Sequence, residues 1–570
     1  MKKQKFAGLI AILVLPVLLF AQGGKNYGMF APRDAYLPGS KYPYYGSENE
    51  WSRRMFSEKA ANKYYKRRGQ RQLLAILDGH PERTVELCKT RLKENPSDGE
   101  TLYMLAVAYS QLNQIKAAWA TMKRALKSGL PLERFLSGPR ELLKPLSNSA
   151  EFRKYFPVSS GRLIHGPLLG SVTDHSARFW VRTLGEDTVT VRVFQKSESG
   201  NYFHSTPTVS GKNRDYSVIA EVDGLSPDTD YYYDILINGV SALQPSYPPF
   251  RTFPRQGTSA RFKIAFGGGA GYTPKYQYMW NTIHKQNLTA LLLLGDNVYI
   301  DLPEHPGTFH RYTYYRLQSS PPFRNLTAST PVFAIWDDHD AGIDDIWMGP
   351  YLDKPAWKLP LLRIFKNNWN NPAYGTDKTP GTYFKFSIAD VDFFMLDCRF
   401  YRTNPFAPTR TMLGSEQKAW LFNQLAKSKA TFKVIVSSVP WAYDSKPNSK
   451  DTWNGFRQER EEIFNFLTRR RIGGVILLSA DRHRSEAWKI NRQNDYPLYE
   501  FESSKLTNMH THALVPGAIF GYNKKCSFGT LRFDTLKKNP EVRYQIVNID
   551  GEVINSITLK RNELKFQPKK

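Results

Sequence analysis

The chain has little cysteine and few acidic residues for its length. It holds three cysteines in 570 residues, which is too few for a disulfide-stapled scaffold or a cysteine-built zinc array. Aromatic residues make up 14% of the chain and apolar residues 41%, which excludes a mainly disordered protein. Asp and Glu number 52 against 79 Lys and Arg, a formal net charge of +27. This excess favours an anionic partner, and it leaves nucleic acid, phosphate esters, lipid headgroups and cell-wall polymers open.

Long apolar runs are missing after the first twenty residues. Three lysines within the first five residues precede an apolar run from Phe6 to Phe20, and the small residue Ala21 follows. A basic start, a short apolar core and a small residue are the pattern of a secretory signal peptide. The run is shorter than the roughly 20 residues of a membrane-spanning helix. We therefore expect residues 1–21 to be cleaved, leaving a secreted or periplasmic protein without stable membrane insertion.

The length predicts roughly 3–5 domains. Residues 22–60 are rich in Gly, Pro, Tyr and charge, which is typical of an extended lead-in. Over residues 61–157 the apolar and small residues follow a helical spacing, with a break at 112–114. The pattern resembles one tetratricopeptide unit and predicts a small all-α segment. A groove for a protein partner is one interpretation, and a helical domain packed on its neighbour is the favoured one.

Residues 160–255 show a different pattern. Ser176–Val181, Thr188–Val193 and Asp230–Ile235 alternate between apolar and polar residues with period two, as half-buried strands do. Turn sequences such as Ser226-Pro227-Asp228 separate them. This predicts an immunoglobulin-like β-sandwich.

Strands and helices alternate from Arg261 onward, which predicts an α/β domain over residues 261–555 and a basic tail over 556–570. The expected strands are Phe262–Phe266, Leu291–Leu294, Val332–Trp336, Val391–Leu396, Phe432–Ser437 and Val475–Leu478. The expected helices are Tyr276–Lys285, Ser415–Leu425 and Arg457–Arg470.

Acids, histidines and one arginine follow several of these strands. The segments are Gly295-Asp296-Asn297-Val298-Tyr299, Asp337-Asp338-His339-Asp340, Asp397-Cys398-Arg399 and Ser479-Ala480-Asp481-Arg482-His483. The carboxyl ends of strands are where α/β proteins form their sites. For one segment alone, a helix cap or a surface turn explains the residues as well. For all of them together, a metal site is the better interpretation, because buried acids need a cationic partner.

The types of donor narrow the choice of metal. Carboxylates (Asp296, Asp338, Asp481), an imidazole (His483) and a phenolate (Tyr299) suit Ca, Fe, Mn or Zn better than a soft thiolate site does. Asp296, directly after a buried strand, is the candidate for a carboxylate that bridges two cations. His510 and His512 alternate nearby, and a solvated loop is the favoured interpretation for them.

These segments, in this order, resemble those of the PhoD-type alkaline phosphatases, a branch of the calcineurin-like metallophosphoesterases. The resemblance covers about 160–550 and includes the predicted β-sandwich as the N-terminal domain of that family. It implies an exported phosphomonoesterase or phosphodiesterase with a binuclear or multinuclear metal centre. The implied fold is a pair of sheets flanked by helices.

The resemblance also implies residue roles. Asp296 would bridge the metals, Tyr299 would ligate the iron-like site, and Asp338, Asp481 and His483 would complete the coordination. His339 would be the general acid or a phosphate-oxygen donor. The family has a cysteine ligand after the first strand, where this sequence has Gly269. Glycine offers no side-chain ligand, so the identity of the metal stays open.

The expected reaction is hydrolysis of phosphate monoesters or diesters by a metal-activated hydroxide at alkaline to neutral pH. Arg399 has two interpretations: a cation that stabilises the transition state, or a structural partner of Asp397 or another acid. Two alternative functions remain. One is a catalytically degenerate binding protein for anionic polymers or a partner protein, and the other is a nuclease with nucleic acid as its substrate.

Overall fold

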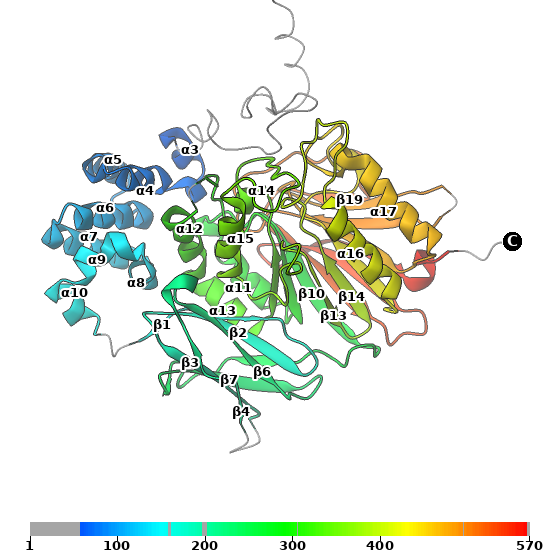
Figure 1. Cartoon of the computed structure of the whole chain (residues 1–570), viewed down its shortest axis with the longest axis horizontal. Helices are drawn as coiled ribbons and strands as arrows, with labels where there is room; N and C mark the ends of the chain where they lie inside the picture. Colours follow the sequence, from blue (N-terminus) through cyan, green and yellow to red (C-terminus); the bar gives the residue numbers. More distant parts are fainter. Residues whose placement is uncertain (1–56, 158–160, 197–201, 305, 494, 567–570) are drawn as a thin grey trace, which may run out of the picture.

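The computed structural model describes residues 57–157, 161–196, 202–304, 306–493 and 495–566. The predicted signal peptide and most of the predicted lead-in lie outside these residues. Figure 1 shows three regions: helices in blue and cyan, a β-region below them, and a larger α/β region from green to red. Within the described residues, no helix combines the length and the apolar character that crossing a bilayer requires.

The first region is helical. Its elements are α3 (Glu58–Lys63), the 3-10 turn η2 (Tyr65–Arg67), α4 (Gln70–Leu77), α5 (Pro81–Glu94), α6 (Gly99–Gln111), α7 (Ile115–Lys127), α8 (Glu133–Ser137), α9 (Arg140–Ser147) and α10 (Ala150–Tyr155). Asp98 caps α6 by accepting a hydrogen bond from the Thr101 N–H. The break predicted at 112–114 separates α6 from α7. The boundary predicted at residue 60 is wrong, because α3 already begins at Glu58. The tetratricopeptide assignment stays a prediction.

The second region is built from strands in two sheets. One sheet has the order β1 (Leu163–Gly170), β2 (Ser176–Thr183), β6 (Ser217–Asp223). The other joins β4 (Phe203–His204), β3 (Thr188–Phe194), β7 (Asp230–Ile237) and β8 (Val240–Ser241), with β5 (Thr208–Val209) and β9 (Pro249–Arg251) at its sides. Phe179 of β2 packs against Tyr233 of β7 with ring centroids 4.5 Å apart, so the inner faces of the two sheets share one apolar core. The immunoglobulin-like classification stays a prediction.

The third region holds two larger sheets. The first has the order β12 (Val332–Ile335), β11 (Ala290–Leu294), β10 (Arg261–Gly267), β20 (Ser527–Asp534), β21 (Glu541–Asn548), β22 (Val553–Lys560). The second has the order β13 (Phe384–Ile388), β14 (Val391–Met395), β15 (Phe432–Val436), β16 (Val475–Ser479), β18 (Leu498–Ser503), β17 (Ser485–Ile490), β19 (Phe520–Tyr522). Phe393 of β14 meets Phe533 of β20 with ring centroids 6.1 Å apart. The two sheets therefore pack face to face over an aromatic core.

Helices cover the outer faces of this pair of sheets (Figure 1). One face carries α11 (Met279–His284), α13 (Pro321–Ser329) and α15 (Lys358–Lys366), and the other carries α16 (Gly414–Lys427) and α17 (Arg457–Arg469). The predicted α/β class is confirmed. The prediction of a basic tail over residues 556–570 is wrong for its first part. Residues 556–560 belong to β22, which pairs with β21, and a 3-10 turn follows at Arg561–Leu564.

The parallel strands place the site. β10, β11 and β12 run parallel in one sheet, and β14, β15 and β16 run parallel in the other. The loops at their carboxyl ends meet: a Cβ on Gly268, after β10, would lie 2.8 Å from the Cβ of Ala480, after β16. Only glycine permits so close an approach, and it brings the chemistry-bearing loops of both sheets together.

The helical region is fixed to the α/β region by buried polar contacts. Arg134 donates to the Glu100 carboxylate at 2.7 Å, and both side chains are 1% exposed. The Tyr312 hydroxyl, from α12 (Thr308–Gln318) of the α/β region, donates to the same carboxylate. Glu100 therefore joins the two regions, so the helical region packs firmly against the α/β region.

Candidate metal centre

The loop after β11 presents Asp296 and Tyr299. Asp296 has a φ of +53°, a conformation that costs a non-glycine residue energy and that clusters at functional sites. The Asp340 carboxylate holds the loop by accepting hydrogen bonds from the N–H groups of Asn297 and Val298, both at 3.1 Å. The Tyr299 hydroxyl donates to Asp296 Oδ2 at 2.7 Å. The loop thus places a carboxylate and a phenol in contact with each other.

The loop after β12 adds Asp338 and His339, which begin the short helix α14 (Asp338–Ala341). One ligand atom from each of Asp296, Asp338 and His339 lies within 4.8 Å of the other two. Asp338 Oδ2 accepts a hydrogen bond from the Asp345 N–H at 2.9 Å. The spacing of Asp296 and Asp338 suits carboxylates that share a small cation, with His339 beside them.

The loop after β16 brings Asp481 and His483. Both residues have positive φ, +71° and +48°, so this turn is also strained. A Cβ on Gly269 would lie 3.2 Å from His483 Nδ1. The position at which the sequence resemblance expects a cysteine therefore lies beside His483.

Four buried atoms that can ligate a metal lie where these loops meet, and none has a hydrogen-bond partner among the described residues. They are Asp296 Oδ1, Asp337 Oδ2, Asp481 Oδ2 and His483 Nδ1. An unsatisfied buried polar atom costs about 1–3 kcal/mol, so four in one place call for a ligand. Carboxylate oxygens and an imidazole nitrogen are donors for Ca, Fe, Mn or Zn. The types of donor present fit a metal centre, although Gly269 supplies no ligand. Of the predicted ligands, Asp296 and Asp338 belong to a group whose ligand atoms lie within 4.8 Å of one another, and Asp481 and His483 do not.

The electrostatics agree with this fit. Burial raises the pKa of Asp296 well above its ordinary value, and the neighbouring Asp338 and Asp337 add to the shift. Burial likewise raises the pKa of Asp337, to about 8. Burial, with His510 nearby, lowers the pKa of His483 well below its ordinary value. The imidazole is therefore neutral, as a metal ligand must be. At Asp296 and Asp337 burial outweighs the nearby positive charge of His339 and Arg399.

His339 is held by a second acid. Its Nδ1 lies 2.5 Å from Asp301 Oδ1, and Asp301 forms a buried ion pair with Arg67. Burial would lower the pKa of His339, but Asp301, Asp338 and Asp296 outweigh it and raise the pKa to about 10. Without bound metal, His339 therefore carries a proton next to the acids, which is the state that the predicted general acid requires.

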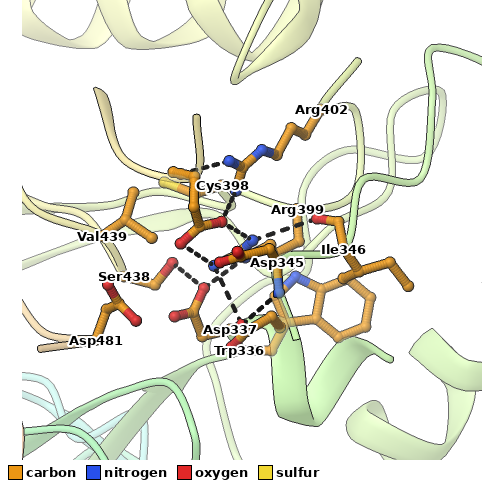
Figure 2. A network of polar contacts seen from close by, with 12 residues as sticks. Trp336, Asp337, Asp345, Ile346, Cys398, Arg399, Arg402, Ser438, Val439 and Asp481 are labelled. Carbon is orange, nitrogen blue, oxygen red and sulfur yellow. Dashed lines mark hydrogen bonds and ion pairs between the residues drawn. The ribbon is translucent and has the colours of Figure 1, made fainter. Parts of the chain in front are cut away.

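Arg399 has a different environment (Figure 2). Its Nε donates to Asp337 Oδ1 at 2.6 Å and its Nη1 to Asp451 Oδ1 at 2.6 Å. Its side chain is 0% exposed. Of the two interpretations open from the sequence, these contacts favour a structural partner of acids. The acids are Asp337 and Asp451; the Asp397 carboxylate instead accepts the backbone N–H of Arg399 at 2.9 Å.

Several residues of the site were missed in the sequence. Asp301 and Asp451 lie outside the quoted segments, and Lys66 and Arg67 come from the helical region. Lys66 Nζ stands 3.3 Å from the centroid of the Tyr299 ring. Nothing in the local sequence around Lys66 indicates this contact, because the contact depends on how two regions pack.

The loop with His510 and His512 also borders the site. Their rings lie 5.0 and 5.7 Å from the His483 ring, centroid to centroid, and the Asn508 side-chain amide donates to the Tyr299 hydroxyl at 2.5 Å. The sequence favoured a solvated loop here. The structure places this loop against two predicted ligands.

Comparison with protein families matches most of the described β and α/β regions. The profile of the PhoD-like phosphatases matches residues 264–566, more than half of the chain. A domain of unknown function, DUF7800, matches residues 160–255.

Two curated proteins are similar in sequence. Alkaline phosphatase D of Bacillus subtilis (strain 168) is 25% identical over 382 residues, 58% of this chain and 62% of that protein. Purple acid phosphatase 23 of Arabidopsis thaliana is 24% identical over 296 residues, 49% of this chain and 58% of that protein. The chain thus spans about six-tenths of the length of these relatives.

Two solved structures share the fold. The structure of PhoD aligns with a TM-score of 0.59 at 18% identity, over 70% of this chain and 90% of the other. The purple acid phosphatase PPD1 of yellow lupin (Lupinus luteus) aligns with a TM-score of 0.52 at 13% identity, over 70% of this chain and 75% of the other.

Proposed function

Because the chain belongs to the PhoD-like phosphatase family, we propose that it is a secreted, metal-dependent phosphoesterase acting on phosphate monoesters or diesters at neutral to alkaline pH. The observation that carries the proposal is the set of four unsatisfied buried donor atoms where the strand ends of two sheets meet. A protein without a cation at this point would bury these donors at a cost and gain nothing from them.

Asp296, Tyr299, Asp338, Asp481 and His483 would hold two or more cations, with Asp296 shared between them. Such cations neutralise phosphate oxygens and lower the pKa of a bound water. The surrounding residues contribute by positioning the metal ligands. Asp340 fixes the backbone of the Asp296 loop, so that the shared carboxylate is oriented before substrate arrives.

Proton transfer to the leaving group would fall to His339. Its Nδ1 is engaged with Asp301, so the proton for the leaving oxygen is held at Nε2. Asp301 both orients the ring and keeps the imidazolium stable. Arg399 would support the site through Asp337 without touching the substrate.

The proposal is tested with purified protein on p-nitrophenyl phosphate and on bis(p-nitrophenyl) phosphate, before and after chelation. We expect release of p-nitrophenol, its loss with chelator, and its recovery on adding one of Ca, Fe, Mn or Zn. Gly269 supports the alternative of a binding protein for anionic polymers, since it removes a ligand. A purified chain that releases no product with any of the four metals would contradict the proposal and favour that alternative.

A further inference from the structure

Residues 64–70 of the helical region lie against the proposed metal centre. Arg316 of α12 holds this segment: Nη2 donates to the Lys66 carbonyl at 2.6 Å and Nη1 to the Arg68 carbonyl at 3.1 Å. The Gln70 side-chain amide donates to the Tyr299 carbonyl at 2.7 Å. The segment is thus fixed to the same loop that carries Asp296.

Lys66 is buried within this segment, with 7% of its surface exposed. Its Nζ faces the Tyr299 ring at 3.3 Å from the centroid. Among the described residues, no carboxylate oxygen comes within the 4.0 Å of an ion pair with Lys66 Nζ. An ammonium carries three N–H donors, and the face of one ring does not satisfy them.

Lys66 borders a cavity and the glycine-rich loop. A small cavity is lined by Lys66, Ala270, Tyr272, Tyr299 and Arg316, among other residues. A Cβ on Gly271, in the glycine-rich loop after β10, would lie 3.0 Å from Lys66 Cδ, so the Lys66 side chain runs along that loop. The ammonium therefore ends beside a predicted metal ligand with unfilled hydrogen-bonding capacity.

We propose that Lys66 binds the phosphate group of the substrate, as a cation that the helical region supplies to the catalytic site. This inference rests on the proposed function. The site needs such a cation because the buried Arg399 is committed to Asp337 and Asp451. An ammonium is a compact point charge that binds phosphate oxygens without fixed geometry.

The same segment also reaches the proton donor. Arg67, next to Lys66, pairs with Asp301, and Asp301 holds His339. The segment thus links phosphate binding to the residue that protonates the leaving group. The charge of Lys66 also has a consequence for specificity. A phosphate monoester carries more negative charge than a diester, so the charged form of Lys66 favours monoesters.

The test compares Lys66→Met and Lys66→Gln, which remove the charge, with Lys66→Arg, which keeps it. Lys63→Met is the matched control, since Lys63 is an exposed lysine at the end of α3, directly before this segment. Binding of inorganic phosphate is measured by calorimetry, and kcat and KM are measured on the monoester and the diester. Metal content and thermal unfolding are recorded for every variant.

We expect the uncharged variants to bind phosphate about 10- to 100-fold more weakly, with unchanged metal content. Their kcat/KM should fall more for the monoester than for the diester, Lys66→Arg should recover part of the loss, and Lys63→Met should match the wild type. Wild-type phosphate affinity in both folded, uncharged variants would overturn the inference. Loss of metal from them would overturn it too, since Lys66 would then be structural. An inactive wild type would contradict the proposed function, whereas calorimetry would still test Lys66.

Discussion

Two buried basic side chains reach the candidate metal centre from different parts of the chain, and they differ in what their N–H groups contact. Arg399 follows β14 and donates to two carboxylates, Asp337 and Asp451. Lys66 comes from the helical region and faces an aromatic ring. We call Arg399, Asp337 and Asp451 the arginine side, and Lys66, Tyr299, His483 and Gly269 the lysine side. A cation with satisfied donors supports structure, and one with unsatisfied donors is placed to receive a ligand.

The largest effect is expected at Asp296, the carboxylate predicted to bridge two cations. Asp296→Asn keeps the shape of the side chain and removes the charge that would hold two cations. We expect phosphate release to fall by about 1,000-fold or more, measured as kcat/KM on the monoester. Asp353→Asn, an exposed acid, is the control. An Asp296→Asn protein with activity within a few-fold of the control would refute the ligand assignment.

The arginine side should respond in stability. Arg399→Met leaves Asp337 buried without its ion-pair partner, whereas Asp451 keeps Arg402 and Lys446. Breaking a buried ion pair costs about 3–5 kcal/mol. Denaturant unfolding of Arg399→Met and Lys66→Met measures the contrast, because Lys66 has no carboxylate partner to leave behind. We expect the Lys66 variant within about 1 kcal/mol of wild type. Equal destabilisation by the two variants would contradict the claim that Arg399 has a structural role and Lys66 does not.

A smaller effect is expected at Asp301, which connects Arg67 to His339. In the metal-free protein the carboxylates around His339 raise its pKa to about 10 despite burial. Asp301→Asn removes one of these charges, so the His339 pKa should fall, and the imidazolium should be lost at lower pH. NMR titration of the ring in metal-free protein measures the change. Activity should drop about 10- to 100-fold. An unchanged His339 titration would show that Asp301 does not hold the ring.

The smallest effect is expected at Gly269 on the lysine side. Its φ of +72° disfavours any side chain, and a Cβ there would meet His483 Nδ1 at 3.2 Å. Gly269→Ala should lower the free energy of unfolding by about 1–2 kcal/mol and weaken metal binding. Gly257→Ala is the matched control, with a φ of +78° and open space around its Cβ. Equal metal affinity in the two variants would mean that Gly269 does not bear on His483.

Much of the α/β region could be predicted from sequence. Phe262–Phe266 falls within β10, and the break at 112–114 separates α6 from α7, because local periodicity and turn residues decide such elements. β22 was missed because it is an edge strand in which only Leu559 is fully buried, and because the basic residues Lys560 and Arg561 lie at its end. Edge strands lack the apolar signal of buried ones.

Some residues of the site could likewise be predicted from the sequence, and others could not. Asp296 and His339 could be predicted because each lies within the first few residues after a strand, and the carboxyl ends of parallel strands converge. Lys66 and Asp451 could not, since their contacts depend on tertiary packing between segments far apart in the chain. Sequence likewise could not decide the role of Arg399, which depends on whether acids from other loops reach its guanidinium.

The most direct test of the central claim is elemental analysis of the purified wild-type protein. The account predicts two or more bound ions of Ca, Fe, Mn or Zn per chain, removed by chelator together with phosphate release. A metal-free protein that hydrolyses phosphate esters at full rate in the presence of chelator would contradict it.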